Sequence, residues 1–171
     1  KVTQAELEAL ARSYDIILAA KNSLLVGLAR NQLEFFMRDH TFIKSIYTVN
    51  NKVDLVTGFL SLEGLSIPED ISVNLQAVLK AKSQNLDKKS EQFVFNEKST
   101  FDQIDQPQWS LVIVVPLIQE LGISKLTGLL VGHISINDII QKSLLELDSK
   151  LAKIEFFYNT TEIFKFVNSK D

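Results

Sequence analysis

The fold of this 171-residue chain is decided by two apolar stretches, residues 109–118 (WSLVIVVPLI) and residues 126–136 (LTGLLVGHISI). Each is rich in Val, Ile and Leu, and each has the length of a strand rather than of a helix. A strand that is apolar on both faces has to be covered on both faces, which predicts two central strands of one sheet. The short connection 119–125 favours antiparallel pairing of the two strands.

Further elements are predicted on either side of these strands. They are strands 43–49 and 53–62 around an Asn50–Asn51 turn, helices 68–82 and 137–150, and a hairpin of 153–158 with 162–167. The helix after the central strands is expected to be capped by Asn137 or Asp138, and Gly58 is expected to mark a bulge. Residues 83–108 are polar and form the longest predicted loop, with a short strand near Phe93–Phe95 as an option. The fold class is therefore α+β, with one antiparallel sheet of about five or six strands and flanking helices.

The first forty residues have a helical pattern of apolar side chains. A capping box of Thr3 and Glu6 opens it, and no proline interrupts it, which predicts one long helix over residues 3–38. This helix is expected either to belong to the core or to pack partly on a partner. The second reading predicts that two copies pair as a homodimer along Leu7, Leu10, Tyr14, Ile17 and Leu24.

The composition excludes several classes of function. The net charge is −3 and no basic patch stands out, which argues against a nucleic-acid partner. The chain has no cysteine and two histidines, so disulfides, thiol catalysis and a His- or Cys-based metal site are not expected. Runs 110–119 and 126–137 are too short to cross a bilayer. Because Lys1 is not an initiator methionine, we expect a piece of a longer protein whose membrane segments lie outside it.

Catalytic signatures are missing from the sequence. It contains no nucleophile elbow, no Walker loop and no dinucleotide-binding glycine motif. Gly128 and Gly132 lie inside an apolar strand, where glycine permits a close backbone approach. A small hydrolase or transferase that uses Asp102 or Asp105 is an alternative, but no nucleophile–base pair supports it. We therefore expect no enzymatic activity and no cofactor.

The two central stretches resemble the Cache family of PAS-like extracytoplasmic sensor domains. Members of this family show a Val-x-Pro-hydrophobic strand, a turn and a Gly-x-hydrophobic-hydrophobic-Gly strand, which residues 114–118 (VVPLI) and 128–136 (GLLVGHISI) fill here. The resemblance implies a single sensor domain over 1–171, with a long helix over 1–40 and a PAS-like core over 41–171. It also implies a periplasmic position in a receptor with flanking transmembrane helices. The output region would be a histidine kinase, a diguanylate cyclase or a chemoreceptor.

The predicted ligand site is a pocket on one face of the sheet, under a lid formed by residues 83–108. Its residues are Trp109, His133, Phe93, Phe95 and Phe101. His133 stands where amino-acid-binding members of the family place an aspartate, and a protonated histidine repels cations, so a neutral or anionic small molecule is expected. In the alternative interpretation the aromatic residues are plain core, and His133 is a partly buried histidine bonded to a backbone carbonyl.

A second interpretation of the whole chain is a cytoplasmic profilin-like or longin-like protein-interaction module. Such a module shares the strand and helix content predicted here and does not need a first helix of membrane length. Hydrophobic spans next to Lys1 and Asp171 in the parent protein would eliminate it.

Overall fold

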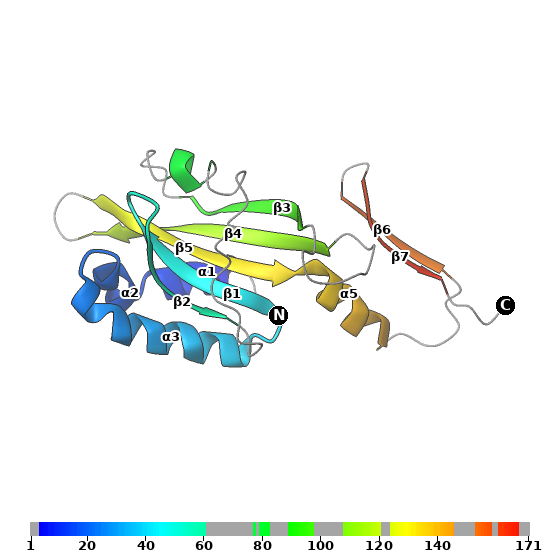
Figure 1. Ribbon diagram of the computed structural model, residues 1–171, viewed down its shortest axis with the longest axis horizontal. Helices are drawn as coiled ribbons and strands as arrows, with labels where there is room; N and C mark the ends of the chain where they lie inside the picture. The colour runs from blue at the N-terminus through cyan, green and yellow to red at the C-terminus, as the bar shows by residue number, and fades with distance from the viewer. Residues whose placement is uncertain are drawn as a thin grey trace. The chain divides into compact units, whose positions relative to one another are not determined.

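The sheet of the protein has five strands in the order β2-β1-β5-β4-β3 (Figure 1). The strands are β1 Ile43–Asn50, β2 Leu55–Leu60, β3 Glu91–Glu97, β4 Gln108–Gln119 and β5 Lys125–Ser135. The computed structural model describes residues 4–60, 77, 79–82, 89–97, 108–120, 124–145, 153–158 and 161–167. The two strands predicted from the apolar stretches are β4 and β5, and both are interior strands of the sheet. The predicted α+β class and the antiparallel sheet of about five strands are confirmed.

Both faces of β5 are covered. Leu129, Leu130 and Val131 follow one another in this strand and are all fully buried. Since successive side chains of a strand point to opposite faces, core lies on each side of the sheet. This is the arrangement that the apolar character of the strand predicts.

One face of β5 approaches the N-terminal helices closely at its two glycines. A Cβ atom on Gly132 would lie 3.1 Å from Leu7 Cδ1. A Cβ on Gly128 would lie 3.3 Å from Ala20 Cβ and only 2.1 Å from the Val49 backbone oxygen. The close backbone approach that the two glycines predict is therefore present.

The single helix predicted over residues 3–38 is wrong. Its place is taken by α1 Gln4–Ala11, α2 Tyr14–Ala19, the 3₁₀ turn η1 Ser23–Leu25 and α3 Val26–Asp39. Ser13 has an extended backbone (ψ 128°), and its carbonyl accepts the Ile17 N–H, so one helix ends and another begins there. A second reversal occurs at Asn22, whose side-chain oxygen accepts the Leu24 N–H at 3.0 Å. The helices α2 and α3 contact each other as a result of these turns.

Three local predictions also differ from the structure. The helix α5 Ile136–Leu145 is capped by Ser135, whose hydroxyl oxygen accepts the Asp138 N–H at 3.1 Å, and not by Asn137 or Asp138. The irregularity between β1 and β2 lies at Thr48/Val49, while Gly58 pairs in register with Tyr47. Phe93 and Phe95 belong to the edge strand β3 and not to a lid loop.

Contacts within the chain group it into two units. The first is Lys1–Phe93 with Val112–Ile134, and the second is Val94–Leu111 with Ser135–Asp171. The first holds α1, α2, α3 and most of the sheet, and the second holds α5 and the hairpin of β6 Lys153–Tyr158 with β7 Thr161–Val167. The predicted C-terminal hairpin is confirmed, and the single-domain organisation stays a prediction. In the part of the chain that the structure describes, no helix is both long and apolar enough to cross a membrane.

Candidate functional site

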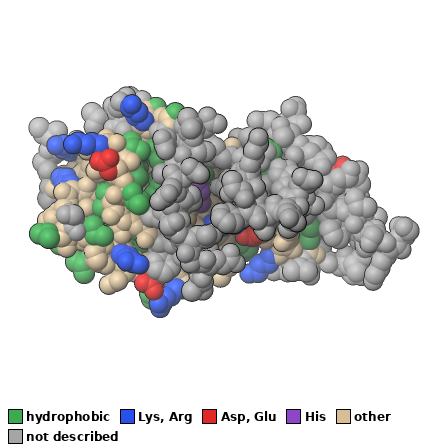
Figure 2. Space-filling view, in the orientation of Figure 1, with side chains coloured by type: hydrophobic (Ala, Val, Ile, Leu, Met, Phe, Trp, Pro, Cys, Tyr) green, Lys and Arg blue, Asp and Glu red, His purple; other side chains and the backbone are tan. Residues whose placement is uncertain are grey.

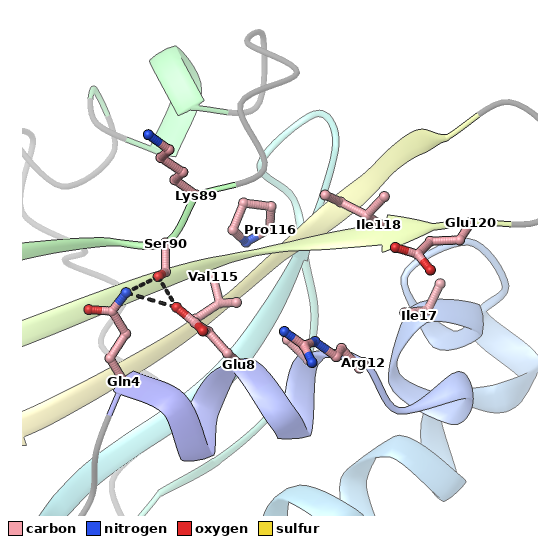
Figure 3. Close-up of a pocket in the computed structure, with 11 residues that line it drawn as sticks. Gln4, Glu8, Arg12, Ile17, Lys89, Ser90, Val115, Pro116, Ile118 and Glu120 are labelled. Carbon is pink, nitrogen blue, oxygen red and sulfur yellow. Dashed lines mark hydrogen bonds between the residues drawn. The ribbon is translucent and has the colours of Figure 1, made fainter.

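A groove of about 720 Å³ lies in the first unit, between α1, the start of β3 and the second half of β4 (Figure 3). Small-molecule sites commonly have volumes of roughly 300–1,000 Å³, and this groove falls in that range. Its lining combines buried apolar residues with polar and charged ones. The lining residues are Gln4, Glu8, Ala11, Arg12, Ile17, Lys89, Ser90, Val115, Pro116, Ile118 and Glu120.

A hydrogen-bonded polar cluster joins α1 to the residues just before and within β3. Gln4 Nε2 donates to Glu8 Oε1 at 2.8 Å and also to Ser90 Oγ. Ser90 Oγ donates in turn to Glu8 Oε1, and Gln92 Nε2 donates to Gln4 Oε1 at 2.8 Å. The dashed lines in Figure 3 mark the three bonds among Gln4, Glu8 and Ser90. The cluster therefore ties the first helix to the edge of the sheet.

The same cluster keeps Glu8 ionised. The hydrogen bond from Ser90 is the largest cause that lowers the pKa of Glu8 below its ordinary value of 4.5, followed by the bond from Gln4. Loss of solvent around the carboxylate works in the opposite direction, and the charge of Arg12 lowers the pKa further. Hydrogen bonds to a carboxylate favour its charged form, so Glu8 is an anion at neutral pH.

Replacement of Ser90 by alanine is expected to raise the pKa of Glu8 toward 4.5, because Ser90→Ala removes the largest cause of its lowering. A lowered pKa means that the folded chain binds this proton more weakly than the unfolded chain does. The contribution of Glu8 to stability is therefore present above pH 4.5 and is lost as the pH falls through the folded-state pKa. Carbon-13 NMR titration of the glutamate carboxyl groups measures the shift.

Ser13→Ala is the matched control for this titration, since the Ser13 hydroxyl bonds to Gln32 and not to Glu8. It is expected to leave the pKa of Glu8 where it is. An unchanged Glu8 pKa in Ser90→Ala would contradict the hydrogen-bonded cluster.

Arg12 and Glu120 are charged groups of the groove that remain without close partners. Neither side chain makes a hydrogen bond or an ion pair with the residues that the structure describes. Glu8 and Arg12 are one helical turn apart, a spacing that often gives an ion pair. Here the hydrogen bonds from Gln4 and Ser90 both reach Oε1 of Glu8, and Arg12 acts on Glu8 through its charge.

Sequence reasoning missed this groove. The repeat of polar residues at Gln4, Glu8 and Arg12, four residues apart, could have indicated a polar face of α1. Ser90 is 82 residues away from Glu8 in the sequence, and no local pattern links the two.

On β5, the structure places His133 beside a tyrosine of β1. His133 Nε2 lies 3.3 Å from the Tyr47 hydroxyl, and the two ring centroids are 5.7 Å apart. His133 is half-buried, and Tyr47 is buried. Because Ser45 is opposite His133 in the ladder, and Tyr47 is opposite Val131, these side chains share one face of the sheet. Tyr47 was not among the predicted site residues.

In the second unit, Trp109 has one satisfied and one unsatisfied N–H group. Its backbone N–H donates to Asn137 Oδ1 at 2.8 Å. Its indole Nε1 is buried and has no hydrogen-bond partner among the described residues. A buried N–H donor that lacks an acceptor lowers the stability of the fold, and such groups are normally hydrogen-bonded.

The other predicted ligand-binding residues are described less completely. Phe93 is half-buried on β3, and Phe95 belongs to the same strand. Phe101 lies outside the described residues, as do Asp102 and Asp105. The aromatic site therefore stays a prediction. Within the described ranges, no group of three or more His, Cys, Asp or Glu residues is placed to hold a metal ion.

The five residues predicted to form a dimer helix do not lie on one helix. Leu7 and Leu10 belong to α1, Tyr14 and Ile17 to α2, and Leu24 to η1. Leu7 and Ile17 are buried within the chain, whereas Tyr14 and Leu24 are 61% and 88% exposed. Pairing of two copies stays a prediction.

Comparison with solved structures identifies the fold. One similar structure is the extracellular domain of the predicted histidine kinase vpHK1S-Z8, with a TM-score of 0.59 and 16% identity, which covers 85% of this chain and 54% of that chain. Another is the domain of a predicted sensory box/GGDEF family protein from Vibrio parahaemolyticus, with a TM-score of 0.52 and 17% identity, over 85% of this chain and 57% of that chain.

This chain therefore spans somewhat more than half the length of each of the two similar structures. No family model matches the sequence, and no curated protein matches it. The structural likeness shows that the chain shares the fold of these two domains, which agrees with the α+β fold that the resemblance to the Cache family predicts.

Proposed function

We propose that this chain is the ligand-sensing domain of a membrane signalling receptor and that it lies outside the cytoplasm. The observation that carries the proposal is the fold, which is shared with the extracellular domain of a predicted histidine kinase and with a domain of a sensory box/GGDEF protein. In this proposal the chain itself has no catalytic activity. Its output region is a histidine kinase, a diguanylate cyclase or a chemoreceptor signalling region.

The structure offers a physical basis for sensing in the way α1 rests on the sheet. The helix is held by Leu7 against Gly132 and by the polar cluster of Gln4, Glu8 and Ser90. A ligand changes the position of such a helix only if it binds one arrangement more tightly than another. A groove lined by both α1 and β4 can supply that difference, because its ligand contacts both elements.

The predicted contacts of His133 and Trp109 with a neutral or anionic ligand belong to this proposal. His133 is half-buried beside the Tyr47 hydroxyl, so a ligand at this position meets groups that can orient it by hydrogen bonds. The indole N–H of Trp109, which has no hydrogen-bond partner among the described residues, favours a ligand with a hydrogen-bond acceptor.

A thermal-shift screen of small metabolites tests ligand binding. At least one compound is expected to stabilise the chain, since a ligand that binds only the folded form raises its melting temperature. His133→Ala and Trp109→Ala are expected to weaken the response. His40→Ala is the control. His40 lies at the C-terminal end of α3, where its ring stacks on that of Phe36 with the two ring centroids 4.1 Å apart. Unchanged affinity in both site variants would remove His133 and Trp109 from the ligand site.

Signalling is tested in a chimaera in which the chain replaces the extracellular domain of a histidine kinase with a known output. A stabilising compound is expected to change phosphorylation by that kinase. A chain that binds compounds in the screen but never alters the output, in any linker register, would contradict the sensor function and favour an interaction module.

A further inference from the structure

We infer that the groove beside α1 is a binding site for an aliphatic monocarboxylate, with Arg12 as its anchor. The inference deepens the proposed sensor function by naming a ligand class, and it rests on that function only for its biological role. The groove lies on α1 and β4 and contains none of the residues predicted from the sequence to bind ligand.

Arg12 supplies the anchor. Its guanidinium lines the groove and makes no hydrogen bond or ion pair with a described residue. Figure 3 shows this group lying between Glu8 on one side and Ile17 with Glu120 on the other. A guanidinium binds a carboxylate through two parallel N–H···O bonds, a geometry that a single ammonium cannot match. Among the described residues, Arg12 forms no ion pair with Glu8, although the charges of the two groups act on each other.

The apolar residues of the lining favour a ligand with an aliphatic chain. Ala11 and Ile17 of the helices are buried, and so are Val115 and Pro116 of β4, while Ile118 is half-buried. Lys89 and Glu120 of the lining are exposed, so the groove reaches the protein surface and a flexible chain can enter it. A ligand with a hydrocarbon chain loses contact with water against these side chains.

The acidic residues of the lining favour a ligand that carries only one negative charge. Glu8 is an anion at neutral pH, and Glu120 is an exposed carboxylate at the end of β4. A second carboxylate on the ligand would come close to one of these two groups, and like charges at such a site repel. Lys89 does not offset this repulsion near Arg12, because its ammonium points away from Arg12 in Figure 3.

Three six-carbon compounds test the inference on the whole chain: hexanoate, hexanamide and adipate. Calorimetric titration at pH 7 is expected to show saturable binding of hexanoate and at least about tenfold weaker binding of hexanamide, which lacks the charge. Adipate is expected to bind more weakly than hexanoate. Glu120→Gln should narrow the difference between adipate and hexanoate, since it removes one of the repelling carboxylates.

The decisive variant is Arg12→Gln, which is expected to weaken the binding of hexanoate at least about tenfold. Arg30→Gln is the matched control, because Arg30 is an exposed arginine of α3 that does not line the groove. Circular dichroism verifies that both variants are folded. Absence of saturable hexanoate binding overturns the inference, and so does equal binding of hexanoate by Arg12→Gln and the unmodified chain.

Failure of this inference and failure of the proposed function are distinguishable. If the chain binds hexanoate through Arg12 but never changes the output of the chimaera, the binding site is supported and the sensor function is contradicted. A chain that changes the output with another compound, and does not bind hexanoate, keeps the sensor role and loses this ligand.

Discussion

Gly128→Ala is expected to destabilise the protein by about 3 kcal/mol, whereas Gly132→Ala is expected to cost about 1 kcal/mol. The two glycines lie four residues apart on β5, but an added methyl group meets different neighbours. At Gly128 it would lie 2.1 Å from the backbone oxygen of Val49, and β1 is held in place there by its ladder with β5. At Gly132 it meets Leu7 Cδ1 at 3.1 Å, the far end of a flexible side chain. Denaturant unfolding monitored by circular dichroism measures both free energies of unfolding.

Gly27→Ala is the control for these two variants. Gly27 lies in α3, and a Cβ there would have no neighbour within 4 Å. Alanine restricts the unfolded chain more than glycine does, so this variant is expected to gain about 0.5–1 kcal/mol. Equal destabilisation by Gly128→Ala and Gly132→Ala would show that the approach of β1 to β5 at Gly128 is not as close as the structure has it.

Leu7→Ala is expected to lower the free energy of unfolding by about 2–5 kcal/mol, the usual cost of emptying a buried leucine site. Leu24→Ala is expected to change it by no more than about 0.5 kcal/mol. Both residues belong to the apolar pattern of the first forty residues, yet Leu7 is fully buried against β5 and Leu24 is 88% exposed. Denaturant unfolding of the two variants compares them directly.

The comparison is repeated at two protein concentrations, because the stability of a dimer depends on concentration. If Leu7→Ala lowers the free energy of unfolding equally at both concentrations and Leu24→Ala does not lower it, Leu7 stabilises the single folded chain and not a dimer. A cost at Leu24 that grows with protein concentration would instead support the predicted pairing of two copies. An equally large cost at both positions, independent of concentration, would contradict the turn at Asn22.

The sheet could be predicted because its strands carry their own signals. Residues 109–118 are apolar at every position but Ser110, and residues 126–136 carry Leu, Val or Ile on both faces of the strand. A strand apolar on both faces is typical of the interior of a sheet, and the two stretches are β4 and β5. The alternation in residues 43–49 predicts β1, which runs one residue further than expected, to Asn50. The N-cap of α5 was misplaced by two or three residues. Ser135 is both the last residue of β5 and the cap of α5, and the apolar strand pattern indicates only the first of these roles.

The candidate ligand contacts could be predicted only in part. His133 was singled out because it interrupts an apolar strand, and the structure places it beside the Tyr47 hydroxyl. Its neighbour comes from β1, and the identity of that neighbour follows from the β1–β5 register, which the sequence does not specify residue by residue. Phe101 lies outside the described residues, so its role stays a prediction.

The sequence by itself determined β1, β2, β4, β5, the C-terminal hairpin and α5, because hydrophobic periodicity reports which side chains each element buries. Only the tertiary structure decided how the first forty residues are divided. Ser13 and Asn22 are ordinary residues in a helical pattern, yet one helix ends and another begins near each of them, and α2 and α3 contact each other in the folded chain. The groove was decided in the same way: Glu8 and Ser90 are 82 residues apart, and their hydrogen bond forms only after α1 has docked on the sheet. Local patterns encode burial, whereas a site built across elements depends on distances that exist only in the folded chain.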